Sequence, residues 1–431
     1  MMKLSVVLFL SLFILSYSNA QNSWHSQNSG TNKFLTGVFF LDDNLGWAAG
    51  WTGTILHTTD GGQIWVDQNA PPTNAYSSIQ FADNQTGWAV GFAGRIVRTT
   101  DGGSTWNIQS SGTQYSINDL HFVNSDKGWT VGGKARDFTD PIREILNTNN
   151  GGLTWSRQMF DSGKEPLSSI FFLDENIGFA VGSFSTILRT DDGGNNWVEQ
   201  MYGTDYQFRD VFFVNSDTGW VVGQDNSLQH YAVIFNTTDG GTSWNSQNLG
   251  NDESLSSIYF VDDSTGWAVG GTSTTSLILH TSDGGMNWTP QASGTSNFLT
   301  SIHFVNENNG WAVGYDGTII RYGAVITTVE NIGRDNLLPQ TVQLENNYPN
   351  PFNPITQIAF SLPQNSTVSL KIFSVTGQLV NTLISSSLSA GQYTVTWDGT
   401  NPYGQAVSSG VYIYQLKAGN EIRTKRMHLL K

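Results

Sequence analysis

The sequence predicts an all-β protein, a seven-bladed β-propeller closed by an N-terminal strand and followed by a small Ig-like β-sandwich. Three observations predict this fold. A Gly-aromatic pair recurs seven times, six of the repeats close with Gly-Gly-x-x-Trp, and a different alternating pattern replaces the repeat near the C-terminus. The composition agrees, because 46 glycines, 12% aromatic and only 13% charged residues are typical of many short strands joined by turns.

The repeats lie 41 to 50 residues apart. Their Gly-aromatic pairs are Gly46-Trp47, Gly87-Trp88, Gly128-Trp129, Gly178-Phe179, Gly219-Trp220, Gly266-Trp267 and Gly310-Trp311. Each repeat has the pattern of four short strands. Strands this short cannot bury their faces alone, so neighbouring four-stranded units must stack, and a period of this length indicates a repeat architecture.

The two ends of the repeat region complement each other. The seventh repeat has no closing Trp, whereas Trp24 begins WHSQNSGTNKFLTGVFF, which parallels WTPQASGTSNFLTSIHFV from Trp288. Trp24 is therefore expected to supply the fourth strand of the last blade. This closes the ring and leaves no free edge between the first and last blades.

Length differences between repeats indicate where a binding site lies. The distance from the pair's Gly to the closing Trp is 19 residues in three repeats, but 27 from Gly128, 25 from Gly219 and 22 from Gly266. The inserted residues are expected in the loop after the second strand. Loops of one class project from one face of a propeller, which is where binding usually occurs.

Aromatic residues on these loops are the candidate ligand-binding residues. Four of them are expected at equivalent positions after the second strand, and two more lie in long loops: Trp51, Phe92, Phe184, Tyr315, Phe138 and Tyr231. Aromatic side chains beside polar ones suit recognition of a protein or a glycan. Alternatively, these rings shield the joints between neighbouring blades.

The closing motif has a structural explanation. Its acidic residue accepts hydrogen bonds from turn amides, the two glycines adopt φ > 0, and the Trp covers apolar surface. The residues at the acidic position are Asp60, Asp101, Asn150, Asp192, Asp239 and Asp283. Asn150 keeps one acceptor oxygen, which fits a structural role better than a catalytic one.

This motif resembles the Asp-box, or BNR, repeat, S/T-x-D-x-G-x-T-W, as in Thr99 to Trp106. With the GW[AV]xG strand added, the whole unit is similar to the propellers related to the photosystem II stability and assembly factor. The resemblance covers Trp24 to Tyr322. It implies a propeller whose polar residues late in the third strand could bind a partner, namely His57, Arg98, Asn147, Arg189, Asn236, His280 and Arg321. The alternative for these residues is hydrogen bonding near the box turn.

No catalytic residue is predicted. Asp-boxes also occur in sialidases, but the arginine cluster of that class is absent, since only Arg209 lies in the inner strands. The alternative is an extracellular glycoside hydrolase with two carboxylates from loops, for which Asp137, Asp140 and Glu144 are candidates. The histidines lack metal-ligand spacing, so we expect no metal and no cofactor.

Residues 1–20 are expected to be a secretory signal peptide, with Lys3, an apolar run from Val6 to Leu15 and cleavage after Ala20. The propeller is assigned to residues 21–322 and a linker to residues 323–343. The chain has no cysteine, so stability must come from packing.

Residues 344–431 have alternating strands separated by Gly, Asn and Pro turns, which predicts a β-sandwich. Their PNPFNP, V-x-G-Q and SGVYIY motifs and basic tail occur in the order of the type A C-terminal sorting domain of the Por, or type IX, secretion system. The resemblance implies that this domain directs export to the cell surface or the medium, with the secretion machinery as partner.

The net charge of −15 is concentrated in residues 21–344, which carry 13 basic and 32 acidic side chains. Such a surface repels phosphate backbones, so nucleic acid is not expected as a partner. The expected function is a monomeric, non-enzymatic propeller, secreted or on the cell surface, that binds a protein or glycan.

Overall fold

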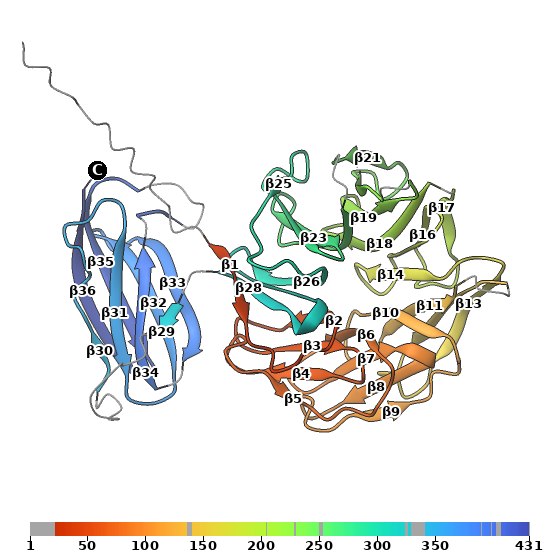
Figure 1. The fold of residues 1–431 in the computed structure, drawn as a ribbon, viewed down its shortest axis with the longest axis horizontal. Coiled ribbons are helices and arrows are strands. Elements are labelled where there is room, and N and C mark those ends of the chain that lie inside the picture. The colour runs from red at the N-terminus through yellow and green to blue at the C-terminus, as the bar shows by residue number, and fades with distance from the viewer. Residues whose placement is uncertain are drawn as a thin grey trace, which may run out of the picture.

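The computed structural model describes residues 22–135, 140–203, 205–227, 230–249, 253–323, 326–328, 341–388, 390–397, 399–401 and 407–430. Asp137 and Phe138 lie outside these residues. Figure 1 shows a ring of small sheets and a separate sandwich. The all-β prediction is confirmed, since the regular elements are strands and two short 3-10 turns.

Seven four-stranded antiparallel sheets form the blades of the ring. Blade 1 contains β2 (Leu35–Phe40), β3 (Gly46–Gly50), β4 (Ile55–Thr58) and β5 (Val66–Asp67). Blade 2 contains β6 (Tyr76–Phe81), β7 (Gly87–Gly91), β8 (Arg95–Thr99) and β9 (Asn107–Gln109). Blade 3 contains β10 (Ser116–Phe122), β11 (Gly128–Lys134), β12 (Ile142–Thr148) and β13 (Ser156–Ser162). Blade 4 contains β14 (Leu167–Phe172), β15 (Gly178–Gly182), β16 (Thr186–Thr190) and β17 (Val198–Met201).

The remaining three blades follow the same order. Blade 5 contains β18 (Tyr206–Phe213), β19 (Gly219–Asp225), β20 (Ala232–Thr237) and β21 (Asn245–Asn248). Blade 6 contains β22 (Ser254–Phe260), β23 (Gly266–Thr272), β24 (Thr275–Thr281) and β25 (Thr289–Pro290). Blade 7 contains β26 (Leu299–Asn306), β27 (Asn309–Gly314), β28 (Ile319–Gly323) and β1 (Ser23–Gln27).

The N-terminal strand closes the ring, as predicted. β1 pairs antiparallel with β28, and Trp24 lies opposite Tyr322. The Trp24 ring meets the edge of Phe304 at 5.8 Å, the same T-shaped contact that Trp106 makes with Phe81 in blade 2. Trp24 therefore replaces the closing Trp that the seventh repeat lacks.

A stack of two aromatic rings on a Gly holds each pair of neighbouring blades together, with Trp on Phe at six joints and Phe179 on Phe213 between blades 4 and 5. Trp47 of blade 1 stacks on Phe81 of blade 2 with ring centroids 3.5 Å apart, and equivalent stacks occur at all seven joints. On the same Phe81 ring lies Gly87, where an added Cβ would meet ring atoms at 2.5–2.6 Å. The recurring Gly of the Gly-aromatic pair is thus required by the aromatic ring packed on it.

The two faces of the ring carry different connections. Because each blade is an antiparallel meander, successive connections alternate between its two ends. We call the loop face the one with the loops from second to third strand and the connections from blade to blade. The opposite box face carries the Asp-box turns, which bond the first hairpin turn of the same blade, as in Gly61 N–H to Asn44 C=O at 2.9 Å.

The C-terminal sandwich has two four-stranded sheets. One contains β29 (Ile326–Thr328), β34 (Gly391–Trp397), β31 (Thr356–Leu362) and β30 (Gln343–Leu344), and the other contains β33 (Leu379–Leu388), β32 (Ser366–Ser374), β35 (Gly410–Ala418) and β36 (Glu421–Leu429). Its core comprises only residues between Val342 and Leu429. β29 comes from the expected linker and pairs with β34. Among the described residues, no helix is long and apolar enough to cross a membrane.

Candidate functional site

Four aromatic side chains form a continuous row on the loop face across blades 7 and 1. We define the aromatic row as Phe298, Tyr315, Phe34 and Trp51. Tyr315 lies 5.2 Å from Phe298 in its own blade and stacks on Phe34 of the next blade at 4.3 Å and 6°. Phe34 in turn lies 5.0 Å from Trp51.

Backbone bonds fix the positions of these rings. The N–H groups of Trp51 and Tyr315 donate to the carbonyls of Phe34 and Phe298, at 2.8 and 3.0 Å. Each pair therefore joins the loop after a second strand to the residue just before the first strand of the same blade. The strands of the blades, rather than long loops, therefore fix the positions of the four rings.

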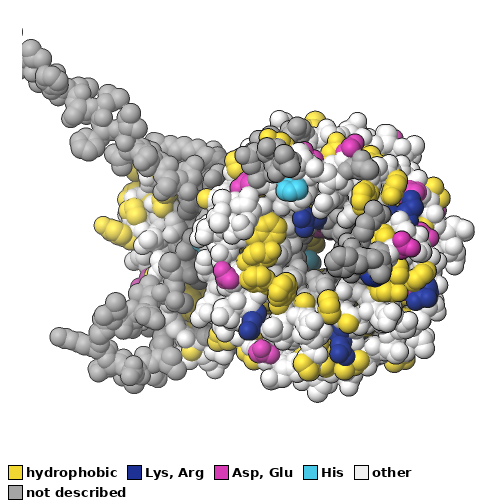
Figure 2. Space-filling view, turned by 45° about the vertical axis from the view of Figure 1, so that its right-hand side comes forward, with side chains coloured by type: hydrophobic (Ala, Val, Ile, Leu, Met, Phe, Trp, Pro, Cys, Tyr) yellow, Lys and Arg dark blue, Asp and Glu magenta, His cyan; other side chains and the backbone are white. Residues whose placement is uncertain are grey.

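The row is partly open to solvent, since Phe34, Phe298 and Tyr315 are half-buried and Trp51 is exposed. Trp51 is 50% exposed, and Phe92, at the same position in blade 2, is 48% exposed. Figure 2 shows hydrophobic side chains gathered beside the central opening of the ring. An exposed cluster of large rings of this kind is typical of an interaction surface.

Arg209 adds one cation near the row. It lies in β18, the inner strand of blade 5, at the register shift between Phe208 and Asp210. Its Nη2 donates to Oε1 of Gln224 at 2.9 Å. Surrounding protein lowers the pKa of the guanidinium, and the neighbouring Tyr315 phenol acts against this shift. Since Tyr315 belongs to blade 7, this electrostatic interaction links Arg209 of blade 5 with the row.

The candidate aromatic residues do not all occupy the expected position. Trp51, Phe92 and Tyr315 follow the closing Gly directly, but Ser183 holds that place in blade 4, where it bridges to Gln207. Phe184 is the next residue and has φ 58°, like Ala93 at 56°. The expected equivalence of Phe184 with Trp51 was therefore wrong by one residue.

The remaining candidates are not part of the row. Tyr231 is half-buried in the loop of blade 5, where Asp225 accepts a hydrogen bond from its backbone N–H at 2.9 Å. Phe138 lies outside the described residues. Phe34 and Phe298 were missed by the sequence interpretation, although the same Phe-Leu-Thr triplet marks both positions.

The box turns form a bonded framework on the box face. In blade 2, Thr99 Oγ1 donates to Asp101 Oδ1 at 2.8 Å, and the N–H of Thr105 donates to the same oxygen at 2.8 Å. These bonds lower the pKa of Asp101, with the Thr105 hydroxyl as the largest cause. Asn150 accepts the same two bonds, at 2.9 and 3.0 Å, and its amide donates to Thr154.

The box also supplies a carbonyl to the preceding blade. The indole N–H of Trp88 donates to the Gly151 carbonyl of blade 3 at 2.9 Å, and four other Gly-Trp residues do the same. Blade 4 has Phe179 instead, and there Arg189 Nη1 donates to Gly240 C=O at 2.7 Å. Blade 7 lacks a box, and the buried Trp267 N–H has no hydrogen-bond partner among the described residues.

The polar residues late in the third strand pack against the Gly-Trp rings. His57 stacks on Trp47 at 4.9 Å, and the Arg98, Arg189 and Arg321 guanidinium groups lie 5.5–5.9 Å from their ring centroids. All seven are half-buried. These contacts favour the structural interpretation of this set over a partner-binding stripe.

Two acids that the sequence interpretation missed face the central channel. Asp119 and Asp210 both lie within 2.9 Å of the Ser169 hydroxyl. Each also accepts a backbone N–H from the next blade, Ile170 at 3.0 Å and Ile258 at 2.9 Å. Burial raises both pKa values, that of Asp210 to about 6, with Asp119 as the next cause.

Beneath these acids, seven side chains surround the channel axis: Phe39, Gln80, His121, Phe171, Phe212, Tyr259 and His303. Successive rings lie 4.8–5.1 Å apart on five sides. Burial lowers the pKa of His121 to about 4 and that of His303 to about 3, so both imidazoles are neutral near pH 7.

Of the acids proposed for a loop-borne hydrolase, the two described ones, Asp140 and Glu144, differ in environment. Glu144 is buried in β12 and pairs with Arg157 at 2.7 Å. Asp140 is exposed, and Asp137 lies outside the described residues. Within the described part of the chain, no cluster of three or more histidine or acidic side chains could hold a metal ion.

The fold and these packing motifs define an Asp-box β-propeller. The family model of photosynthesis system II assembly factor YCF48 matches residues 17–323 in six overlapping stretches. The chain belongs to this family. The FlgD Ig-like domain model matches residues 353–421.

Solved structures show the same fold. YCF48 bound to D1 peptide is 18% identical with a TM-score of 0.57, covering 70% of this chain and 98% of that one. YCF48 from Cyanidioschyzon merolae is 18% identical with a TM-score of 0.55 and the same coverage. The Niastella koreensis GH74 enzyme is 12% identical with a TM-score of 0.54, covering 93% of this chain and 74% of that one. The comparison with curated proteins found no match.

Proposed function

We propose that this protein is a non-enzymatic binding propeller whose aromatic row holds an extended segment of a protein ligand. The contiguous contact of four rings across two blades carries this proposal. Protein interfaces are enriched in Tyr, Trp, Phe and Arg, and a few such residues supply most of the binding energy. Exposed Trp51 offers an aromatic contact, and Arg209 offers a cationic one.

A protein ligand is also supported by the family. One member was solved with a peptide bound. A peptide chain can place successive side chains along a row of rings, because the row crosses a blade joint rather than forming a closed pocket. The acidic body favours a segment that is neutral or basic away from Arg209.

The test is selection of peptides from a random library on the intact protein, followed by affinity measurements on the variants Trp51→Ala and Tyr315→Ala. Ile64→Ala and Met286→Ala are matched controls, because these hydrophobic residues are more exposed but lie beside box turns. We expect each row-side variant to weaken binding about tenfold or more, and the controls to bind as the parent does. Equal binding by all variants would place the ligand elsewhere.

We further propose that the protein is exported and is secreted or attached to the cell surface. The apolar leader at residues 1–20 and the sorting-domain motifs from residue 344 support this route. Deleting residues 344–431 should leave a folded propeller trapped in the periplasm, because its core shares no residue with that of the sandwich. Normal secretion of the truncated chain would refute this proposal.

A glycoside hydrolase is the second candidate, favoured by the structural similarity to a GH74 enzyme and by the acid pair in the channel. Against it, Asp119 and Asp210 are each engaged by a backbone N–H of the next blade. We expect no sugar release from plant or bacterial polysaccharides. Hydrolysis that is abolished by Asp210→Asn would establish the enzyme instead.

A further inference from the structure

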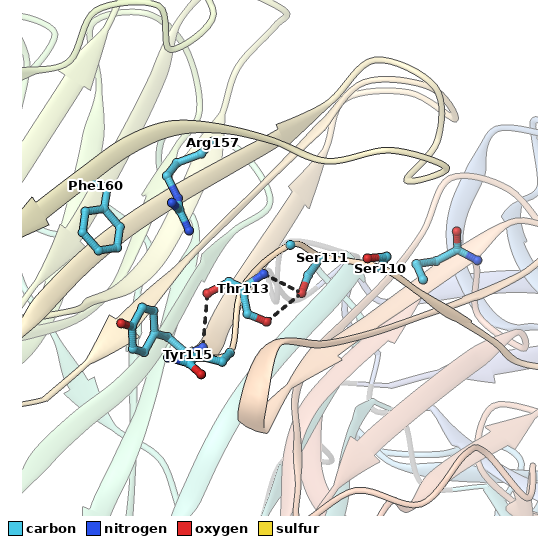
Figure 3. A pocket seen from close by; sticks show the side chains of 9 residues that line it. Ser110, Ser111, Thr113, Tyr115, Arg157 and Phe160 are labelled. Carbon is cyan, nitrogen blue, oxygen red and sulfur yellow. Dashed lines mark hydrogen bonds between the residues drawn. The ribbon is translucent and has the colours of Figure 1, made fainter.

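A second, independent site lies at the outer rim between blades 2 and 3. There a shallow cavity of about 610 Å³, largely open to solvent, is lined by the connection from blade 2 to blade 3 and by the outer strand β13. Its lining residues are Gln109, Ser110, Ser111, Gly112, Thr113, Gln114, Tyr115, Arg157 and Phe160. Figure 3 shows Arg157 and Phe160 on one side of this space and Tyr115, Thr113 and Ser111 on the other.

The insertion in the third repeat builds one wall of the cavity. It lengthens β12, and β13 then pairs along it as far as Ser162, so that Phe160 lies opposite Glu144. The same Ser-Gly-Thr connection occurs at Ser29 and Ser293, with the same internal hydrogen bonds. The outer strands of the following blades, β5 and β1, have two and five residues where β13 has seven.

The floor of the cavity is a rigid turn. The Ser111 hydroxyl accepts the N–H of Thr113 and donates to its carbonyl, each at 3.3 Å, and Thr113 Oγ1 accepts the N–H of Tyr115 at 3.1 Å. The turn therefore holds the Tyr115 ring in place, 6.3 Å from that of Phe160. Phe160 is 43% exposed, so a ring face remains open.

The Arg157 guanidinium is held in place, but not all of its N–H groups take part in hydrogen bonds. Its Nε donates to the buried carboxylate of Glu144 at 2.7 Å, and its guanidinium lies over Phe160 at 4.7 Å. Among the described residues, its two terminal nitrogens have no hydrogen-bond partner. The pair with Glu144 neutralises the cation, so the terminal N–H groups are suited to neutral oxygen atoms rather than to a free anion.

We propose that this cavity binds a neutral saccharide. The exposed Phe160 ring and the half-buried Tyr115 ring can cover the apolar face of a sugar, while Arg157, Gln114 and Ser110 offer donors and acceptors to its hydroxyl groups. The size lies within the range of small-ligand sites. The net charge of −15 disfavours anionic glycans, and the hydroxyl- and amide-rich lining disfavours an apolar ligand.

The test uses the full chain on an array of neutral and acidic glycans, followed by titration of the neutral oligosaccharides that bind. Phe160→Ala should weaken their binding about tenfold, since the substitution removes the stacking surface but leaves the Glu144–Arg157 pair intact. Ile108→Ala, an exposed residue of β9 outside the cavity, is the matched control and should bind normally. Trp51→Ala should also bind normally, because the aromatic row is a different site.

Three results would overturn the proposal. They are the absence of binding by any neutral glycan, undiminished binding by Phe160→Ala, and preferential binding of acidic glycans or acidic peptides. Titration at low and high ionic strength distinguishes a charged ligand from a neutral one. The affinity for a neutral sugar stays unchanged as the salt concentration rises, whereas the affinity for a charged ligand falls.

Discussion

At the scale of single residues, the joints between blades depend on a flat ring stacked on a glycine. Phe81 lies between Trp47 and Gly87, with no room for a Cβ on the glycine side. The repeated Gly-aromatic pair, the strongest signal in the sequence, reflects this contact. The sequence could predict that the pair mattered, but not that the Phe contacting it comes from the preceding strand.

Replacing Gly87 with Ala should destabilise the propeller by about 1–3 kcal/mol, because the new methyl group overlaps the Phe81 ring and the ring cannot move away from Trp47. Urea denaturation measures this change. Gly203→Ala is the control, since its added Cβ makes only an ordinary contact, 3.5 Å from Ser185. Equal midpoints for Gly87→Ala and the parent would contradict the packing argument.

The acid pair in the channel predicts a pH dependence of stability. Burial raises the folded-state pKa of Asp210 from 3.8 to about 6, so the folded protein binds more protons than the unfolded chain between these values. The contribution of Asp210 to the free energy of unfolding is therefore largest below about pH 4 and falls as pH rises through 6.

Asp210→Asn should remove this fall, whereas Asp126→Asn, at an exposed turn, should keep it. Denaturation of the three proteins between pH 4 and 7.5 measures the effect. A parent and an Asp210→Asn variant with parallel pH profiles would contradict the raised pKa.

At the scale of elements, the box is a turn that serves two blades. Its carboxylate holds the turn, and its glycine carbonyl receives the indole N–H of the blade before it. The structural role was predictable from Asn150, which lacks a charge but keeps an acceptor. The hydrogen bond from the indole to the glycine carbonyl was not predictable, because it joins residues about 60 positions apart.

Asp101→Asn should therefore retain most of the parent's stability, because Asn150 makes the equivalent contacts with an amide. Asp101→Ala should lower the urea midpoint clearly, since Thr99 and the Thr105 N–H both lose their acceptor. The urea midpoints of the two variants are compared with that of the parent. A loss in Asp101→Asn as large as that in Asp101→Ala would mean that charge, rather than geometry, holds the turn.

The insertions show the limit of sequence interpretation at this scale. Their position in the loop after the second strand was predicted, and the strand bounds show longer loops there in blades 3 and 5. In blade 6 the inserted residues instead lengthen β23 and β24, with only two residues between these strands. However, Trp51 and Tyr315 of the row lie on the short loops of blades 1 and 7, and the third repeat's insertion also lengthens β12, along which the outer strand β13 pairs. Which aromatic side chains touch across a blade joint depends on the curvature of the propeller. The spacing of the repeats in the sequence does not encode this curvature.

At the scale of the whole molecule, closure depends on one residue far from its partners in sequence. Trp24 contacts Phe304 and Tyr322, 280 or more positions away. The parallel between the segments after Trp24 and Trp288 was enough to predict this closure. The position of β29 beside β34 was not predicted, because a three-residue strand has no sequence signal of its own.

Trp24→Ala should cost about 3–5 kcal/mol of propeller stability, since a buried ring is lost where the chain ends meet. Urea denaturation followed by tryptophan fluorescence measures it. The transition of the sandwich, which has its own core, should stay at its original midpoint. A loss below about 1 kcal/mol would show that β1 does not close the ring.

The central claim, that the aromatic row of the loop face binds a protein segment, is tested most directly by one affinity comparison. A peptide selected on the intact protein is titrated into the parent, Trp51→Ala and Met286→Ala. We expect about tenfold weaker binding of the peptide by Trp51→Ala alone. Unchanged affinity in Trp51→Ala, or an equal loss in Met286→Ala on the opposite face, would contradict it.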